Sequence, residues 1–187
     1  ARPYPVALRN VRRAMAQSKR GSLALFATAT FVFWASLYLY VPVLPVYAQS
    51  LGAGLSTVGA VIASYAVAQL LLRVPIGVGA DLLGSRKLPV VGGMVAVAIG
   101  ALAMGLAPNP WLLVVGRTVT GIGAAAWVAF TVLFISFYPQ SETGRAIGMA
   151  NVVNGVALVA ATATGGVVAQ TWGLAGPFFG AALLGVA

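Results

Sequence analysis

The sequence predicts an all-α membrane protein, a bundle of six transmembrane helices. Of its 187 residues, 60% are hydrophobic and 7% are charged, whereas a soluble domain carries about 25% charged residues because water must wet its surface. Four long stretches, 21–72, 88–116, 118–141 and 146–187, contain no charged residue. A membrane-spanning helix needs about 20 mostly apolar residues, so these stretches hold several spans.

The spans are predicted to be helices because only helices and closed barrels satisfy all backbone polar groups in hydrocarbon. Barrel strands would alternate apolar and polar residues, and these runs are continuously apolar. Gly, Pro, Asn and Ser divide the runs into segments. We place the six spans at Leu23–Tyr47, Thr57–Ala80, Leu88–Leu106, Trp111–Tyr138, Ala146–Ala169 and Leu174 to the chain end.

Residues 1–22 are predicted to form a basic cytoplasmic tail in front of a helix bundle at residues 23–187. The simpler expectation is a disordered tail that sets the orientation of the first span. The alternative is a short helix that touches the headgroup region through Val6, Val11 and Met15 while its cations meet anionic lipid. The tail contains six basic residues: Arg2, Arg9, Arg12, Arg13, Lys19 and Arg20.

The distribution of basic residues predicts how the spans are oriented. Nine Lys and Arg residues lie in the tail, in the loop with Arg86 and Lys87, and in the loop with Arg145, while the other three loops have none. Loops rich in Lys and Arg stay in the cytoplasm. We therefore expect a multi-pass protein of the cell membrane with a cytoplasmic amino terminus.

The composition argues against several functional classes. The chain has no Cys and no His, so disulfides and Cys or His metal sites are excluded, and we expect no metal and no cofactor. An enzyme is not expected, because no His, Cys or acid pair is present to carry chemistry. The net charge of +9 sits in the tail and loops, where membrane orientation accounts for it, so nucleic acid is not an expected partner.

Arg117 is the clearest charged residue inside a span. It follows Trp111 by six residues and so lies roughly 9 Å inside the fourth span. An ionisable residue at such a depth usually faces a bundle interior or a water-filled path. Asp81 and Glu142 belong to the opposite membrane face, so no acid partner is expected in this chain. The alternative is that Arg117 extends to the outer headgroups.

The loop after the second span combines glycine with charge in "GVGADLLGSRK". Gly77 allows another helix to pack closely, and Gly84 is expected to take the positive φ that a very short loop needs. Arg86 and Lys87 are explained by orientation. Asp81 is not, because its charge is unfavourable at the carboxyl end of its own helix. We expect it to face a cation or the amino terminus of another helix.

Two motifs resemble those of the major facilitator superfamily of transporters. The loop above resembles that family's signature between the second and third spans. "LVVGRTVTGIGAAA" resembles its fourth-span motif, in which Arg117 is followed by Gly121, Gly123 and Ala124. The resemblance covers essentially the whole chain and implies the amino-terminal half of a twelve-helix fold. We therefore expect a fragment whose sixth helix is truncated and whose carboxy-terminal half is missing.

The sequence also departs from the family pattern. Leu82 follows the loop acid where the family usually has Arg, and Ser85 follows the second Gly where it usually has a basic residue. In the fifth span Gly165 and Gly166 match a pair found in the family's drug antiporters, but Ala161 and Thr162 stand where a Gly-Pro pair would fall. The loop departures imply a thinner charge network, or one moved to Arg86, and the missing Gly-Pro pair weakens antiport as a specific assignment.

The resemblance implies a gate and a substrate path. The gating loop would comprise Gly77, Asp81, Gly84, Arg86 and Lys87, with Asp81 latching against the second half in one conformation. Substrate would bind near the midplane and be moved by rocking of the two halves.

The polar residues of the first and fifth spans are the candidates for lining that path. Coupling or substrate contact is assigned to Arg117 and Gly121. The residues expected to line the path, with packing or interhelical hydrogen bonds as the alternative, are Trp34, Tyr38 and Tyr40 of the first span and Asn151 and Asn154 of the fifth.

Three functions fit these observations. The first is proton-coupled efflux of small hydrophobic compounds by alternating access. The second keeps the fold and imports sugars or organic anions, and the third is a non-transporting scaffold or an inactive fragment. The expected partners are a small-molecule substrate, a proton or other coupling ion, the lipid bilayer and the missing carboxy-terminal half.

Overall fold

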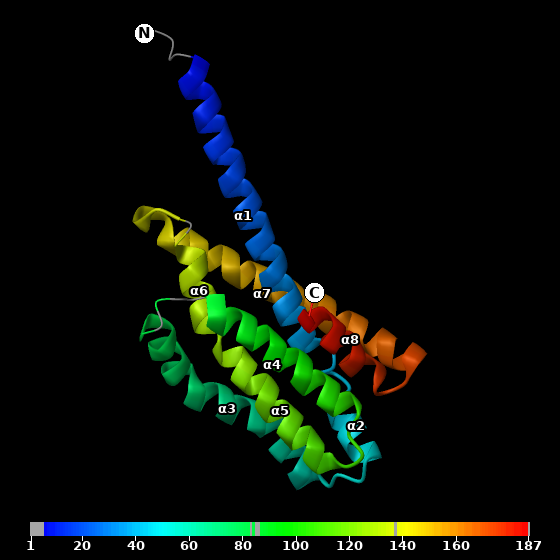
Figure 1. The fold of residues 1–187 in the computed structure, drawn as a ribbon. Helices are drawn as coiled ribbons and strands as arrows, with labels where there is room; N and C mark the ends of the chain where they lie inside the picture. The colour runs from blue at the N-terminus through cyan, green and yellow to red at the C-terminus, as the bar shows by residue number, and fades with distance from the viewer. Residues whose placement is uncertain (1–5, 83, 85–86, 137, 187) are drawn as a thin grey trace.

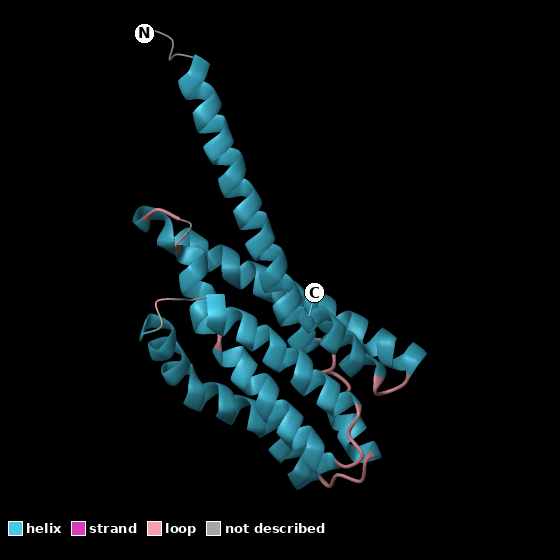
Figure 2. Cartoon of the chain, viewed as in Figure 1, coloured by secondary structure: helices cyan, strands magenta, loops and turns pink. Residues whose placement is uncertain are grey.

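The computed structural model describes residues 6–82, 84, 87–136 and 138–186, and its regular structure there is entirely helical (Figure 1). This confirms the predicted all-α class. Short loops and turns connect the helices (Figure 2). The elements are α1 (Val6–Tyr38), α2 (Leu44–Ser50), α3 (Leu55–Leu82), α4 (Lys87–Gly105), α5 (Pro110–Ala125), α6 (Trp127–Ile135), η1 (Gln140–Glu142), α7 (Thr143–Trp172) and α8 (Gly176–Val186).

The helices fall where the six spans were predicted, and among the residues that the structure describes four segments are long and apolar enough to cross a membrane on their own. These are Leu55–Leu82, Lys87–Gly105, Pro110–Ile135 and Gln140–Trp172. The apolar part of α1, Leu23–Tyr38, and α8 are shorter. Many large apolar side chains on these helices point outward, which suits a surface in contact with lipid tails.

The first predicted span is broken rather than continuous. α1 ends at Tyr38, and tight turns follow in which Val41 donates to the Tyr38 carbonyl at 3.2 Å and Val43 to the Tyr40 carbonyl at 3.2 Å. Pro42 causes the break, because proline has no N–H and disfavours helical geometry in the residue before it. Helix resumes at Leu44 as α2.

The fourth predicted span is also interrupted, at Ala126 between α5 and α6. The Ala126 N–H donates to the Gly123 carbonyl at 3.1 Å, three residues back instead of four. This tightened turn joins α5 to α6 without any proline, and the smooth hydropathy of the stretch gave no sign of it.

Glycines bring α4 and α5 into backbone contact. A Cβ built on Gly93 would lie 2.9 Å from the Gly123 carbonyl oxygen, and one on Gly100 would lie 2.7 Å from the Gly116 carbonyl oxygen. The contacts are reciprocal, since a Cβ on Gly123 would meet the Gly93 oxygen at 2.6 Å. Small residues at helix contacts give the close packing on which membrane helices depend.

An aromatic cluster joins α1 to α6. The Phe26 ring stacks on Phe134 with centroids 4.6 Å apart, and Phe33 lies 4.8 Å from Phe130. These four rings are buried, so they fix α1 against the second part of the fourth span.

The basic tail differs from the simpler expectation. α1 begins at Val6, so the described part of residues 1–22 is helical and continues directly into the first span. In Figure 1 this amino-terminal part of α1 extends beyond the other helices. The alternative expectation of a helical tail is therefore the one that the backbone supports.

Replacing Gly93 by Val tests the close contact between α4 and α5. The new side chain would meet the Ala126 Cβ at 2.6 Å, and such overpacking costs about 1–3 kcal/mol. We expect a lower melting temperature in detergent micelles. Gly92→Val is the matched control, because a Cβ there meets nothing within 4 Å. Equal loss in both variants would contradict the contact.

Candidate functional site

The site is built around Arg117 on α5. The Asn109 side chain caps this helix by accepting hydrogen bonds from the N–H groups of Trp111 at 3.1 Å and Leu112 at 3.2 Å. Pro110 occupies the first helical position, where its missing N–H costs nothing. This fixed start places Arg117 on the inner face of α5, where it is 6% exposed. Arg117 therefore does not extend to the outer headgroups.

Two tyrosines surround the guanidinium of Arg117. Its Nη1 donates a hydrogen bond of 3.2 Å to the hydroxyl oxygen of Tyr40. Its central carbon lies 4.3 Å from the centre of the Tyr65 ring and 5.6 Å from that of Tyr40. A desolvated cation over an aromatic face gains about 2 kcal/mol, so the rings offset part of the cost of burying the charge.

The Arg117 side chain retains unused binding capacity. Within the described residues it forms no ion pair, and its Nε is buried without a hydrogen-bond partner. Buried polar groups are usually paired, and an unpaired one is a common mark of a functional site. The site therefore holds a cation with one donor still available.

Tyr40 and its neighbour Leu39 bring two more helices, α7 and α8, to the same point. The Tyr40 ring stacks on Phe178 of α8 with centroids 4.9 Å apart. The backbone oxygen of Leu39 lies against Gly165 of α7, in the space that a Cβ would fill. The break in the first span is thus the place where α5, α7 and α8 meet it.

Gly121 contributes packing to this site. A Cβ on Gly121 would lie 2.5 Å from the Tyr65 carbonyl oxygen and 3.0 Å from the Ala68 Cβ. The missing side chain lets α3 approach α5 and so brings the Tyr65 ring over Arg117, one helical turn away along α5.

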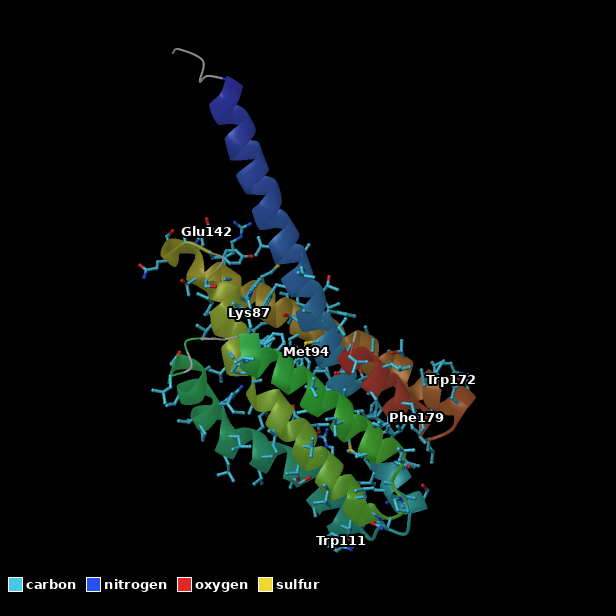
Figure 3. The ribbon with its side chains drawn as sticks, in the orientation of Figure 1. Lys87, Met94, Trp111, Glu142, Trp172 and Phe179 are labelled. Atoms are coloured by element: carbon cyan, nitrogen blue, oxygen red, sulfur yellow. The ribbon has the colours of Figure 1, made fainter. Side chains whose placement is uncertain are left out.

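The charged loops and the exposed tryptophans lie at opposite ends of the helices (Figure 3). Lys87 and Glu142 are at one end, and Trp111 and Trp172 are at the other. Trp111 is 68% and Trp172 73% exposed, as expected for aromatic residues at a membrane interface. The arrangement agrees with basic loops that share one side of the membrane.

The predicted gating loop joins α3 to α4 at the charged end. Asp81 is exposed one residue before α3 ends, and Lys87 is exposed at the start of α4. Gly84 has φ +59°, which confirms the left-handed conformation predicted for it. Arg86 lies outside the described residues.

The helix that packs at Gly77 is less close than the sequence suggested. A Cβ there would lie 3.6 Å from the Val128 side chain of α6. This is an ordinary van der Waals distance, so alanine would fit, and helix packing alone does not require glycine at this position.

The structure brings only some of the predicted path residues together. The side chain of Asn154 on α7 interacts with the hydroxyl of Tyr38 on α1, while Asn151 is exposed one turn earlier. Trp34 is 6% exposed and packs on Tyr38 and Trp127, with centroids 5.4 and 5.1 Å apart. Its Nε1 is buried without a hydrogen-bond partner.

The prediction of site residues missed Tyr65 and gave Tyr40 only a lining role. Tyr65 is the polar aromatic residue at the middle of an apolar helix, which is a weak signal by itself. Tyr40 lies two residues before Pro42, and this proline is a sequence signal that could have predicted the end of a helix near Tyr40. The approach of both residues to Arg117 depends on how the helices are rotated against each other, which no local pattern records.

Cysteine substitution tests whether the Asn151 face of α7 meets water. The native chain has no Cys, so a single introduced thiol gives a clean signal with a maleimide. We expect Asn151→Cys to react about tenfold faster than Val159→Cys, because the reactive thiolate does not form in hydrocarbon. Val159, 68% exposed on the same helix, is the lipid-facing control. Similar rates would contradict an aqueous path at Asn151.

Known proteins resemble the chain over most of its length. The family model described as Major Facilitator Superfamily matches residues 26–187. The inner membrane transport protein YajR of Escherichia coli is 28% identical over 149 residues, 79% of this chain and 32% of that protein. The multidrug resistance protein Stp of Mycobacterium tuberculosis is 27% identical over 161 residues, 84% of this chain and 30% of that protein.

A third relative is the multi-drug resistance efflux pump PmrA of Streptococcus pneumoniae. It is 30% identical over 155 residues, which are 80% of this chain and 35% of that protein. The chain thus spans about a third of the length of these three curated relatives.

Proposed function

Because this chain belongs to the Major Facilitator Superfamily, we propose that it forms the amino-terminal half of a transporter that exports small hydrophobic compounds by alternating access. The observation that carries the proposal is the family match over residues 26–187. Support for export comes from relatives named as multidrug resistance and efflux proteins. The transporter moves its cargo rather than transforming it, so no catalytic residue is assigned.

The burial of the helices supports a second half. In their most apolar segments, 17% of the residues of α3 and of the helix ending at Trp172 are buried, against 39% in α4 and 50% in the α5–α6 segment. α3 and α7 therefore have the largest uncovered faces. We assign the missing carboxy-terminal half to cover part of these faces, with lipid on the remainder.

The gating role of the α3–α4 loop belongs to the same proposal. Asp81 is exposed at the charged end of α3, where it can reach a neighbouring domain. The amino terminus of a partner helix carries about half a positive charge, and an acid beside it gains about 0.3–1 kcal/mol. Two conformations separated by a few kcal/mol are biased by such a contact.

Proton coupling requires a carrier that this half does not offer inside a span. Its two acids, Asp81 and Glu142, both lie at the charged end of the helices. We therefore assign the proton carrier to the second half. The same charged end is assigned to the cytoplasm of a cell-membrane protein, with the amino terminus on that side, because of the basic loops.

Arg117 supports one alternative. A buried guanidinium with an unused donor suits an anionic cargo, since guanidinium groups bind carboxylates well. Import of an organic anion is therefore the second candidate function, and sugar import has no comparable support.

Transport by the complete protein in inside-out membrane vesicles tests the proposal. We expect accumulation of a hydrophobic fluorescent dye when a proton gradient is applied, and its release when an ionophore collapses the gradient. Accumulation of a carboxylate dye in right-side-out vesicles would support the second candidate. If the protein moves neither class of dye under any gradient, both transport functions are wrong.

Replacing Asp81 by Asn tests the gate. We expect a maximal transport rate lower by about fivefold, because the lost contact is worth about 1 kcal/mol, with normal insertion into the membrane. Glu142→Gln is the matched control, since Glu142 is the other acid of the chain and forms an ion pair with the exposed Arg145 at 3.7 Å. A poorly inserted Asp81 variant, or equal effects of both substitutions, would argue against the gate.

A further inference from the structure

We propose that Tyr40 and Tyr65 are positioning residues for Arg117, which hold its guanidinium by a hydroxyl and a ring face and tie it to the break in the first span. This inference rests on the proposed transport function and adds two residues that act through Arg117. Neither tyrosine is assigned a contact with the substrate.

Tyr40 supplies the hydrogen-bond acceptor. It is fully buried, and its hydroxyl oxygen lies 3.2 Å from Nη1 of Arg117. No carboxylate within the described residues takes this place. A hydrogen bond to a charged group is stronger than one between neutral groups, and low surrounding polarity increases the effect. The Tyr40 hydroxyl is therefore the group that fixes one edge of the guanidinium.

Tyr65 supplies the aromatic ring face over which the guanidinium of Arg117 lies. Its ring centre lies 4.3 Å from the guanidinium carbon, well inside the range of cation–π contacts. Tyr65 is held there by its backbone, because its carbonyl oxygen packs on Gly121 one turn beyond Arg117. Tyr65 contacts the cation through its ring and Tyr40 through its hydroxyl, so the two tyrosines act by different chemical groups.

The charges around this cluster are few. Tyr38 and Arg73 are the other ionisable groups that act on Tyr65 besides Tyr40 and Arg117. Both acids of the chain lie at the charged end of the helices, away from this cluster. The contacts with Tyr40 and Tyr65 are therefore the ones that set the position of the Arg117 guanidinium.

The backbone position of Tyr40 connects Arg117 to the break in the first span. Tyr40 lies in the non-helical turn between α1 and α2, where the regular ladder of backbone hydrogen bonds is interrupted. Its ring stacks on Phe178 of α8. A shift of this turn between two conformations would move the hydroxyl away from Arg117, and so the position of the cation would follow the state of the first span.

Three substitutions separate the role of the hydroxyl from that of the ring in the transport assay of the complete protein. We expect Tyr40→Phe to lower the maximal rate about tenfold, the effect of one hydrogen bond to a charge, and to leave the half-saturating dye concentration unchanged. Tyr65→Leu is expected to lower the rate similarly, and Tyr65→Phe to restore most of it because the ring remains.

Tyr47→Phe is the matched control for Tyr40→Phe. Tyr47 is buried and also packs on Phe178, with centroids 4.8 Å apart, but its hydroxyl donates to the Gly105 carbonyl at 3.4 Å and not to Arg117. We expect this variant to transport at nearly the normal rate. Equal loss in both variants would show a general packing effect and overturn the inference.

A thermal double-mutant cycle tests the contact without transport. Tyr40→Phe should lower the melting temperature by about 2–4 °C in the normal background and leave it unchanged or higher in an Arg117→Met background, where the hydroxyl has no cation to bind. Additive effects of the two substitutions would show that Tyr40 and Arg117 do not interact energetically, and would overturn the inference. If the cycle shows coupling but the protein moves no dye, the transport function fails while the contact stands.

If the Tyr40→Phe variant is produced in amounts too small to assay, the comparison of Tyr65→Leu with Tyr65→Phe tests the inference. A much lower rate for Tyr65→Leu than for Tyr65→Phe supports positioning by the ring. Equal rates for these two variants, or a normal rate for a folded Tyr40→Phe, would overturn it.

Discussion

The structure depends on one constraint, which is that polar groups inside a membrane must find partners within the protein. Backbone groups meet it by forming helices, and the described chain is helical throughout its regular structure. Arg117 meets it in another way, through the hydroxyl of Tyr40 and the ring of Tyr65. Within the described residues the cation is thereby held without a carboxylate, at a point where five of the six predicted spans come together.

Close helix packing makes that arrangement possible. Hydrophobic attraction does not hold helices together in lipid, so contact between small residues takes its place. Gly93 and Gly100 meet Gly123 and Gly116 across α4 and α5, and Gly121 lets α3 approach Arg117. The fourth span is thus glycine-rich on the faces that pack against α3 and α4.

The first and fourth spans are each interrupted by a turn, and these turns are irregular points among the closely packed helices. Pro42 interrupts the first span beside Tyr40, and a tightened turn at Ala126 divides the fourth span beyond Gly123. Alternating access moves one half of a transporter against the other around a central site. In the proposed transport cycle, the break beside Tyr40 would let a change in helix geometry reach the buried cation directly, whereas the exposed Asp81 loop is proposed to act on the contact between the halves.

The sequence alone determined the features that depend on hydropathy or charge averaged over about 20 residues, or on a single backbone torsion angle. The positions of the spans, the shared side of the basic loops and the positive φ of Gly84 follow from hydropathy, charge and steric limits, all of which act locally. Only the tertiary structure decided that Arg117 lies between Tyr40 and Tyr65, that Trp34 is buried against Trp127, and that α5 ends at Ala125. These depend on the rotation and distance of one helix relative to another, and a uniformly apolar helix carries no polar face from which that rotation can be read.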